Sequence, residues 1–292
     1  MVMLKPVLDG REKRNLRLLK PRTKHVCKGQ MTVALASKCE GGVCLYADRI
    51  ILGTNGSISE VCKMWHRELT SNRAIAVVTA TSDFDAAQTL AKRIVDGVAA
   101  TTFNTIEEIT NHVEGHLLAW SEPYHVGELA LESYFLMATA VSGTVHLHFL
   151  QPRHTIVSVP HAKVIGIGEP VAQPIVDGLL LENVLVSPQV TLLRLAYAAK
   201  RAKERVVGRG GSNAVVLSTN GSIKPIREID LKFAEDVTDG VAETANNLLQ
   251  FMLALEPPEQ AEKVAPQWGG FIAQTANLLS SHVKFMGLDP PE

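Results

Sequence analysis

Segments with strand character and segments with helix character come in groups along this chain, and this grouping restricts the fold more than any other sequence feature. Apolar, β-rich residues at 31–39 and 43–47 flank Glu40-Gly41-Gly42, where glycine supplies the positive φ that a hairpin turn needs. The further expected elements, in order, are strands near Ser59–Trp65 and Ala74–Thr79, helices at Asp83–Val98 and Thr105–Trp120, strands at Tyr134–Thr139, Thr144–Leu150, Thr155–Val159 and Lys163–Ile167, helices near Pro170–Asn183 and Pro188–Arg205, and strands at Ala214–Ser218 and Ser222–Pro225. Because strands follow strands, the sheets are expected to be antiparallel. The sequence predicts an α+β fold with two antiparallel sheets between two pairs of helices, a four-layer αββα sandwich.

The two ends of the chain differ from this central part. Residues 1–30 carry a net charge of +7, whereas the remainder carries −8. The basic leader lacks the apolar stretch of a secretory signal. We expect a disordered tail or sequence upstream of a misassigned start, because Met31 would itself serve as a start; a cleaved propeptide and a nucleic-acid or membrane-surface arm are the other interpretations. The predicted domains are a leader at 1–31, a main domain at 32–227 and a helical C-terminal extension at 228–292.

The extension is predicted to be helical because its apolar residues recur at steps of three and four. They are Ala234, Val237, Val241, Ala245, Leu248, Met252 and Leu255. A helix with such a face buries it against its own core or against a neighbouring subunit, and the sequence leaves both options open.

Composition indicates a soluble protein of the cytoplasm. No apolar run approaches the roughly 20 residues that span a bilayer, so no membrane partner is expected. The four cysteines, Cys27, Cys39, Cys44 and Cys62, form no CxxC pair, and we expect them to be reduced thiols. No nucleic-acid partner, metal or cofactor is predicted. The histidines at 112 and 116, and those at 146 and 148, share local faces but offer no identifiable third ligand.

Three residue types gather where the predicted hairpin ends. Thr32 opens its first strand, Asp48 closes its second, and Lys63 is expected on the following strand. Closing the hairpin at Glu40-Gly41-Gly42 brings Thr32 and Asp48 together, and Lys63 can lie beside both.

This constellation resembles the start of a proteasome β-subunit, and the chain is identified as an uncharacterised branch of the proteasome β-subunit-like N-terminal-nucleophile (Ntn) hydrolase superfamily. The resemblance covers about residues 31–227. It implies a threonine-type amidohydrolase or peptidase with Thr32 as nucleophile and Asp48 and Lys63 in support. It also implies an oxyanion site at the backbone N–H groups of Thr81 and Ser82, a peptide or other amide substrate, a homo-oligomeric ring and the option of an ATPase partner.

The chemistry of such a site requires a base next to the threonine hydroxyl. In this class the base is the α-amine of the threonine itself, whose reference pKa of about 7.7–8.0 suits neutral pH. A nearby lysine ammonium can lower that pKa, and a carboxylate such as Asp48 holds the lysine in place.

A non-catalytic interpretation stays open beside the enzymatic one. Met31 precedes Thr32, so a free amine requires cleavage, and Ile167 occupies a position where the resemblance implies a supporting serine. The expected Asp and Ser before Gly210-Gly211 are also missing, since Val206, Gly208 and Arg209 occupy that stretch. The alternative is a proteasome-like structural or interaction subunit that keeps the fold without the chemistry.

Overall fold

The computed structural model describes residues 32–52, 57–69, 72–81, 84–121, 133–151, 156–179, 185–207, 210–238 and 240. The predictions for the leader at 1–31 and for most of the extension beyond residue 240 lie outside the described residues.

The first sheet contains the predicted hairpin at its centre. Its antiparallel strands lie in the order β10 (Ala162–Ile165), β1 (Ala34–Cys39), β2 (Gly42–Asp48), β11 (Ser212–Ser218) and β12 (Ile223–Ile226). The turn between β1 and β2 uses Gly41 at φ +65°, as the sequence predicts. Gly42 packs so closely on the β11 backbone that a side chain there would overlap the carbonyl group of Leu217. The hairpin of β1 and β2 thus lies between β10 on one side and β11 on the other.

The second sheet is built from one continuous stretch of the chain. Its strands lie in sequence order: β5 (Met64–Leu69), β6 (Arg73–Thr81), β7 (Ser133–Val141), β8 (Thr144–Leu150) and β9 (Val157–Ser158). All neighbours are antiparallel. The observed bounds of β8 match the predicted strand at Thr144–Leu150.

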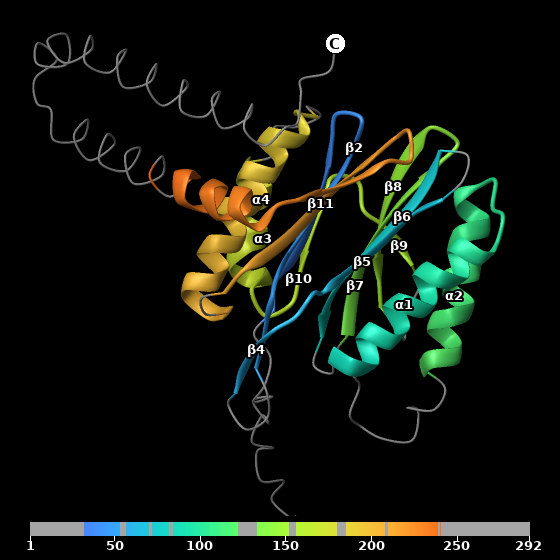
Figure 1. The fold of residues 1–292 in the computed structure, drawn as a ribbon, viewed down its shortest axis with the longest axis horizontal. Helices are drawn as coiled ribbons and strands as arrows, with labels where there is room; N and C mark the ends of the chain where they lie inside the picture. Colours follow the sequence, from blue (N-terminus) through green and yellow to red (C-terminus); the bar gives the residue numbers. More distant parts are fainter. Residues whose placement is uncertain are drawn as a thin grey trace, which may run out of the picture.

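A separate two-stranded ribbon, formed by β3 (Ile50–Leu52) and β4 (Ile58–Glu60), was not expected from the sequence. It replaces the single strand predicted near Ser59–Trp65, because the chain pairs locally at β4 and then crosses to the second sheet at β5. The ribbon projects from one end of the molecule (Figure 1), and every residue of β4 is exposed.

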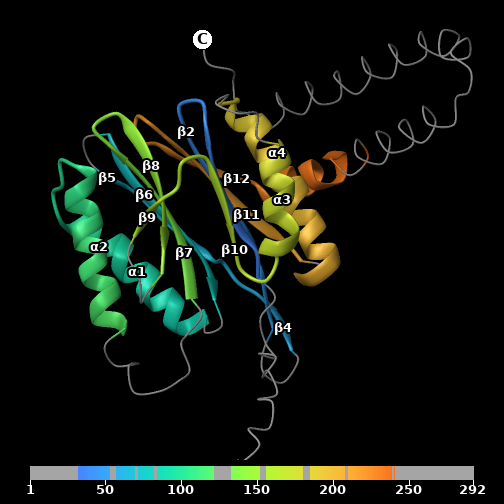
Figure 2. The same cartoon turned by 180° about the vertical axis from the view of Figure 1, so that it is seen from behind.

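Two pairs of helices cover the outer faces of the two large sheets, as Figures 1 and 2 show from opposite sides. The first pair is α1 (Phe84–Ala100) and α2 (Ile106–Ser121), and the second is α3 (Glu169–Leu179) and α4 (Pro188–Ala202), which continues as the π-helical turn η2 (Lys203–Val207). Ser187 caps α4, accepting a hydrogen bond from the amide of Val190, and Pro188 occupies its first turn.

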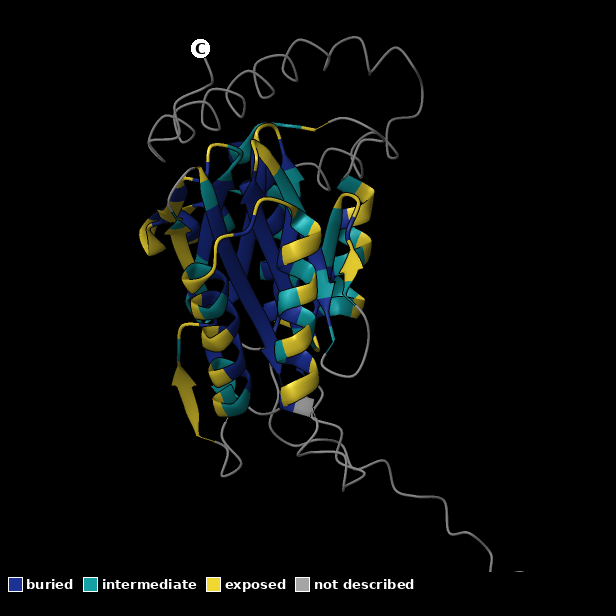
Figure 3. Ribbon diagram, turned by 90° about the vertical axis from the view of Figure 1, so that its right-hand side faces the viewer, coloured by how far each residue is buried: buried dark blue, intermediate teal, exposed yellow. Residues whose placement is uncertain are grey.

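Burial separates the interior into three apolar clusters. One lies between the sheets, one lies under α1 and α2, and one lies under α3 and α4. Figure 3 shows the buried strands between helices whose outward faces are exposed. The predicted α+β class with antiparallel sheets is confirmed, whereas its assignment to the Ntn type stays a prediction.

The start of the C-terminal extension packs on the main domain. Residues 228–238 are helical, and Leu231 and Ala234 belong to the cluster under α3 and α4. This part of the extension thus buries its apolar face against its own chain. Within the described part of the chain, no helix combines the length and the apolar character needed to cross a membrane.

Candidate active site

Thr32 lies two residues before the start of β1 at Ala34 and is only 6% exposed. Its carbonyl oxygen accepts a hydrogen bond from the amide of Gly168 at 3.3 Å. Gly166, at φ +95°, leaves the space that Thr32 occupies, since a Cβ at Gly166 would overlap that carbonyl oxygen and lie 3.0 Å from Thr32 Oγ1. The turn between β10 and α3 therefore fixes the position of the threonine.

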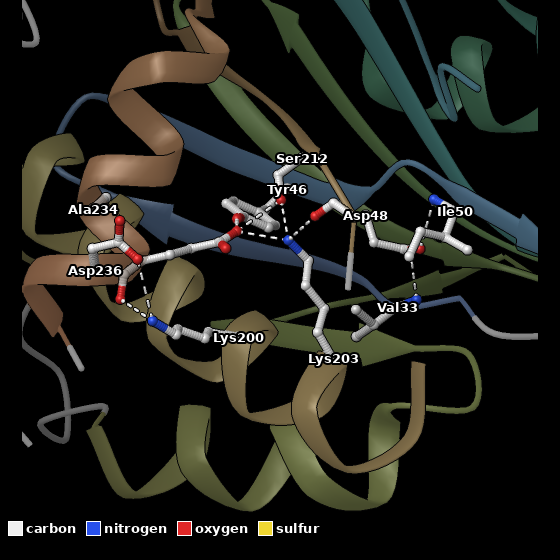
Figure 4. Close-up of polar contacts among 12 residues, drawn as sticks. Val33, Tyr46, Asp48, Ile50, Lys200, Lys203, Ser212, Ala234 and Asp236 are labelled. Carbon is white, nitrogen blue, oxygen red and sulfur yellow. Dashed lines mark hydrogen bonds and ion pairs between the residues drawn. The ribbon is translucent and has the colours of Figure 1, made fainter. Parts of the chain in front are cut away.

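Asp48 is fully buried at the end of β2 and connects Thr32 to Lys63. One carboxylate oxygen accepts the amide of Val33, the residue after Thr32, at 2.8 Å. The other accepts the amide of Ile50 at 3.1 Å and Lys63 Nζ at 3.0 Å. Figure 4 shows Asp48 between the Val33 and Ile50 amides. Asp48 thus makes three hydrogen bonds, one of them to the amide of the residue that follows Thr32.

Lys63 is as buried as its partner and also donates to the carbonyl oxygen of Ile50. It lies just before β5 rather than on a strand, which corrects the sequence expectation; its carbonyl oxygen accepts the amide of Thr79 from β6. Burial lowers the pKa of Lys63 and raises the pKa of Asp48, in each case against the attraction of the opposite charge. The ammonium of Lys63 therefore releases its proton more readily than an exposed lysine does.

The predicted oxyanion residues are placed only in part. Thr81 ends β6, and its Oγ1 lies 2.6 Å from Ser133 Oγ on β7. Its neighbour Ala80 is close to the site, because a Cβ at Gly166 would lie 2.9 Å from Ala80 Cβ. Ser82 lies outside the described residues. The structure pairs Lys63 with Asp48 and binds Asp48 to the amide that follows Thr32, while the catalytic role of these residues and the oxyanion role of Thr81 and Ser82 stay predictions.

A second buried polar cluster lies next to Asp48 and was missed by sequence reasoning. Lys203 of η2 donates to Glu235 Oε1 at 2.7 Å, to Ser212 Oγ and to the carbonyl oxygen of Gly210 at 3.1 Å. Ser212 and Tyr46 both donate to the same Glu235 oxygen. The burial of the Tyr46 side chain raises its pKa, and the nearby Glu235 carboxylate raises it further. No local pattern marks these residues, because they come from separate parts of the chain.

A cavity of about 690 Å³ opens beside this cluster, between α4 and the helix at 228–238. Its charged lining includes Lys200, Lys203, Lys232, Glu228, Glu235 and Asp236.

The histidine pairs show no metal-binding arrangement. Nε2 of His112 and Nε2 of His116 lie 3.2 Å apart over Gly97, where a side chain would collide with both rings. The rings of His146 and His148 stack with centroids 6.3 Å apart, and burial lowers the pKa of His148 to about 4. Among the described residues, no group of three or more His, Cys, Asp or Glu side chains is arranged to hold a metal ion.

The fold is similar to that of solved proteasome-like structures. The Anbu (ancestral beta-subunit) structure from Yersinia bercovieri superposes with a TM-score of 0.62 and 14% sequence identity, covering 77% of this chain and 98% of that one. Anbu from Hyphomicrobium sp. strain MC1 superposes with a TM-score of 0.59 and 14% identity over 77% of this chain and 99% of that one. An Anbu (Gly-1) mutant from the same strain gives a TM-score of 0.60 at 14% identity, over 75% and 99% of the two chains.

No family model matches the sequence, and no curated protein matches it significantly. The structural likeness therefore shows a shared proteasome-like fold. It also corrects the sequence analysis: the identification as an uncharacterised branch of the proteasome β-subunit-like Ntn hydrolases is wrong, because the matching structures are Anbu proteins, which carry a family label of their own.

Proposed function

We propose that this chain is a threonine-type amidohydrolase, acting on peptides or other amides, in which Thr32 becomes the N-terminal residue and the nucleophile. The observation that carries the proposal is the buried Asp48–Lys63 ion pair, held at 3.0 Å, whose carboxylate also binds the amide that follows Thr32. A buried ion pair seldom stabilises a protein more than apolar packing of the same volume would, so a role in chemistry gives it a reason to be there.

The proposed reaction begins when the α-amine of Thr32 takes the proton from Thr32 Oγ1. The oxygen then attacks the carbonyl carbon of the amide, and the C–N bond breaks as the leaving amine takes up the proton. Water hydrolyses the resulting ester and regenerates the hydroxyl. Lys63 lowers the pKa of the α-amine by its charge, and Asp48 keeps Lys63 in place. Backbone N–H groups at Thr81 and Ser82 stabilise the oxyanion.

The wider assignments belong to the same proposal. The four-layer arrangement with helices outside two facing sheets is taken as the Ntn type, with domain bounds at 1–31, 32–227 and 228–292. Exposed apolar side chains on the helix at 228–238, Ile229 at 65% and Phe233 at 42%, support a homo-oligomer, for which we propose a ring. A cytoplasmic location and an ATPase partner stay expectations.

The test is to purify the full chain, determine its N-terminal residue by intact mass, and measure hydrolysis of a panel of fluorogenic peptide amides. Mass photometry of the same samples reports the assembly state. We expect a species that begins at Thr32, with activity that Thr32→Ala abolishes and Thr32→Ser retains in part. Thr191→Val is the matched control, because Thr191 is a buried threonine of α4 whose hydroxyl has no hydrogen-bond partner among the described residues.

The opposite result is equally definite. If Thr32 remains joined to the preceding residue and wild-type protein hydrolyses no amide faster than Thr32→Ala, the hydrolase proposal fails. The non-catalytic structural or interaction subunit then becomes the supported function.

A further inference from the structure

The cluster around Lys203 lies beside Asp48 (Figure 4), because β11, which carries Ser212, pairs with β2, which carries Asp48. Tyr46 and Asp48 are two residues apart on β2, so their side chains point to the same face of the first sheet. Ser212 of β11 is the cross-strand partner of Asp48. The two buried ion pairs, Asp48–Lys63 and Lys203–Glu235, are therefore neighbours on one face.

Lys203 is held in one position by its hydrogen bonds. Its ammonium has three N–H donors, and the three acceptors, Gly210 O, Ser212 Oγ and Glu235 Oε1, use all of them. The Lys203 side chain is 5% exposed and that of Glu235 is 15% exposed, so water competes little for either group. Because each of its donors has an acceptor, the Lys203 side chain is held in one position against the Glu235 carboxylate.

Gly210, whose carbonyl oxygen accepts a hydrogen bond from Lys203, packs against Ile50 next to Asp48 and Lys63. Gly210 packs so closely on Ile50 that a Cβ there would overlap the Ile50 side chain. Ile50 in turn donates its amide to Asp48 and accepts from Lys63 through its carbonyl oxygen. Next to these contacts, the Gly211 carbonyl oxygen accepts the amide of Arg49 at 2.9 Å. Displacing residues 210–212 would therefore displace both partners of the Asp48–Lys63 pair.

The helix at 228–238 contacts this region through two of its glutamates. Its Glu235 neutralises Lys203, and its Glu228 binds Arg49 at 2.7 Å. We propose that Lys203, fixed by Glu235 and Ser212, is a positioning residue for the Asp48–Lys63 pair, and that the helix at 228–238 thereby completes the candidate site. This inference rests on the proposed function for its catalytic meaning, but its physical content can be measured without activity.

The groups that face Lys63 are Asp48 from β2 and Lys203 from η2, with Glu235 and Tyr46 behind Lys203. The positive charge of Lys203 lowers the pKa of Lys63, in addition to the larger effect of burial. Removing the Glu235 charge leaves that cation uncompensated, whereas removing Lys203 and Glu235 together takes the cation away. The two changes should therefore move the titration of Lys63 in opposite directions.

The experiment follows the Lys63 side chain by NMR in full-length protein labelled with ¹³C at lysine Cε, with Lys63→Arg used to assign the signal. We expect Glu235→Gln to lower the titration midpoint by about half a pH unit and the double variant Lys203→Met/Glu235→Gln to raise it by a similar amount. Asp236→Asn is the control. It also removes one negative charge, from the residue next to Glu235, but the Asp236 side chain is 64% exposed, so the Lys63 midpoint should not change.

The double variant is expected to fold, because it removes both charges of the Lys203–Glu235 pair and leaves neither one buried without its partner. Opposite shifts support the inference. Equal midpoints in wild type, Glu235→Gln and the folded double variant overturn it. Amide hydrolysis and the N-terminal residue are measured on the same samples. Opposite shifts in a protein that never hydrolyses an amide refute the hydrolase proposal and leave the coupling between the two ion pairs established.

Discussion

Replacing Lys63 by Met tests whether the Asp48–Lys63 pair is held as a buried charge pair. Met keeps most of the apolar stem of the lysine but removes the ammonium, which leaves Asp48 without its counter-charge at 0% exposure. Breaking a buried ion pair from one side costs about 3–5 kcal/mol. Asp48 retains the amides of Val33 and Ile50, which favours the lower end of that range, while the Ile50 carbonyl loses its donor at a cost of about 1 kcal/mol. We expect a loss of about 3–4 kcal/mol near neutral pH.

The assay is urea unfolding followed by circular dichroism. With an m-value of roughly 2–3 kcal/mol/M, this loss lowers the urea midpoint by about 1–2 M. The matched control is Arg67→Met on β5. Arg67 and Asp96 form an ion pair at 3.1 Å, almost the same separation, but their side chains are 54% and 61% exposed. An exposed pair contributes only about 0–1 kcal/mol, so the control midpoint should barely move.

The pH dependence gives a second check with a definite sign. Burial already raises the pKa of Asp48, and without Lys63 it rises further. The folded variant then keeps a proton that the unfolded chain, with an aspartate pKa of about 3.9, has released. Its stability must therefore fall as pH rises from the unfolded pKa through the folded one. The variant should be less stable at pH 8 than at pH 5, and Asp48→Asn added to Lys63→Met should remove that difference. Equal losses for Lys63→Met and Arg67→Met, or a variant whose stability is the same at both pH values, would refute the reasoning.

Two further predictions concern the turn beside Thr32 and the start of α2. Gly166→Ala places a Cβ against the Thr32 carbonyl oxygen at φ +95° and should destabilise the fold by at least about 2 kcal/mol, measured by urea unfolding. Gly178→Ala in α3, where no described atom lies within 4 Å of the added Cβ, should be neutral or stabilising by up to about 1 kcal/mol, and equal effects of the two changes would contradict the contact at Gly166. The Thr105 hydroxyl accepts a hydrogen bond from the amide of Glu108 at 3.2 Å, and the Glu108 carboxylate accepts one from the amide of Thr105 at 3.3 Å. Thr105→Ala should therefore cost about 1 kcal/mol in the same assay and Thr105→Ser almost nothing, whereas an unchanged midpoint for Thr105→Ala would show that this capping box contributes no stability.

The sequence predicted the elements that depend on local chemistry. Glu40-Gly41-Gly42 identified the hairpin because a turn residue with φ of +65° requires glycine or a close substitute. That hairpin alone was enough to predict the approach of Asp48 to the start of β1, since pairing Ala34 with Ala47 leaves no other register for the strand ends. The approach of Asp48 to the start of β1 could therefore be predicted from the hairpin, whereas the chemical roles of Thr32, Asp48 and Lys63 were implied only by the resemblance.

Contacts between distant segments could not be found in the same way. The ribbon of β3 and β4 is short and exposed, so it carries no apolar pattern. Lys203 and Glu235 are 32 positions apart and lie on elements whose packing the sequence does not specify. Nothing in the sequence around Lys203 distinguishes it from Lys200, whose side chain is 18% exposed against 5% for Lys203. The burial of Lys203 depends on its contact with Glu235 of the helix at 228–238.

The strand order of the two large sheets also determines when the candidate site can exist during synthesis. The second sheet uses only residues 64–158 in sequence order and can pair as soon as that stretch has left the ribosome. The first sheet joins β1 and β2 to β11, which begins at Ser212, and Glu235 follows later still. A growing chain therefore carries Thr32, Asp48 and Lys63 for most of its synthesis without β11, Lys203 and Glu235, which pack beside Asp48 in the folded chain. On the proposed function, the site around Thr32 is therefore complete only after Glu235 has been synthesised.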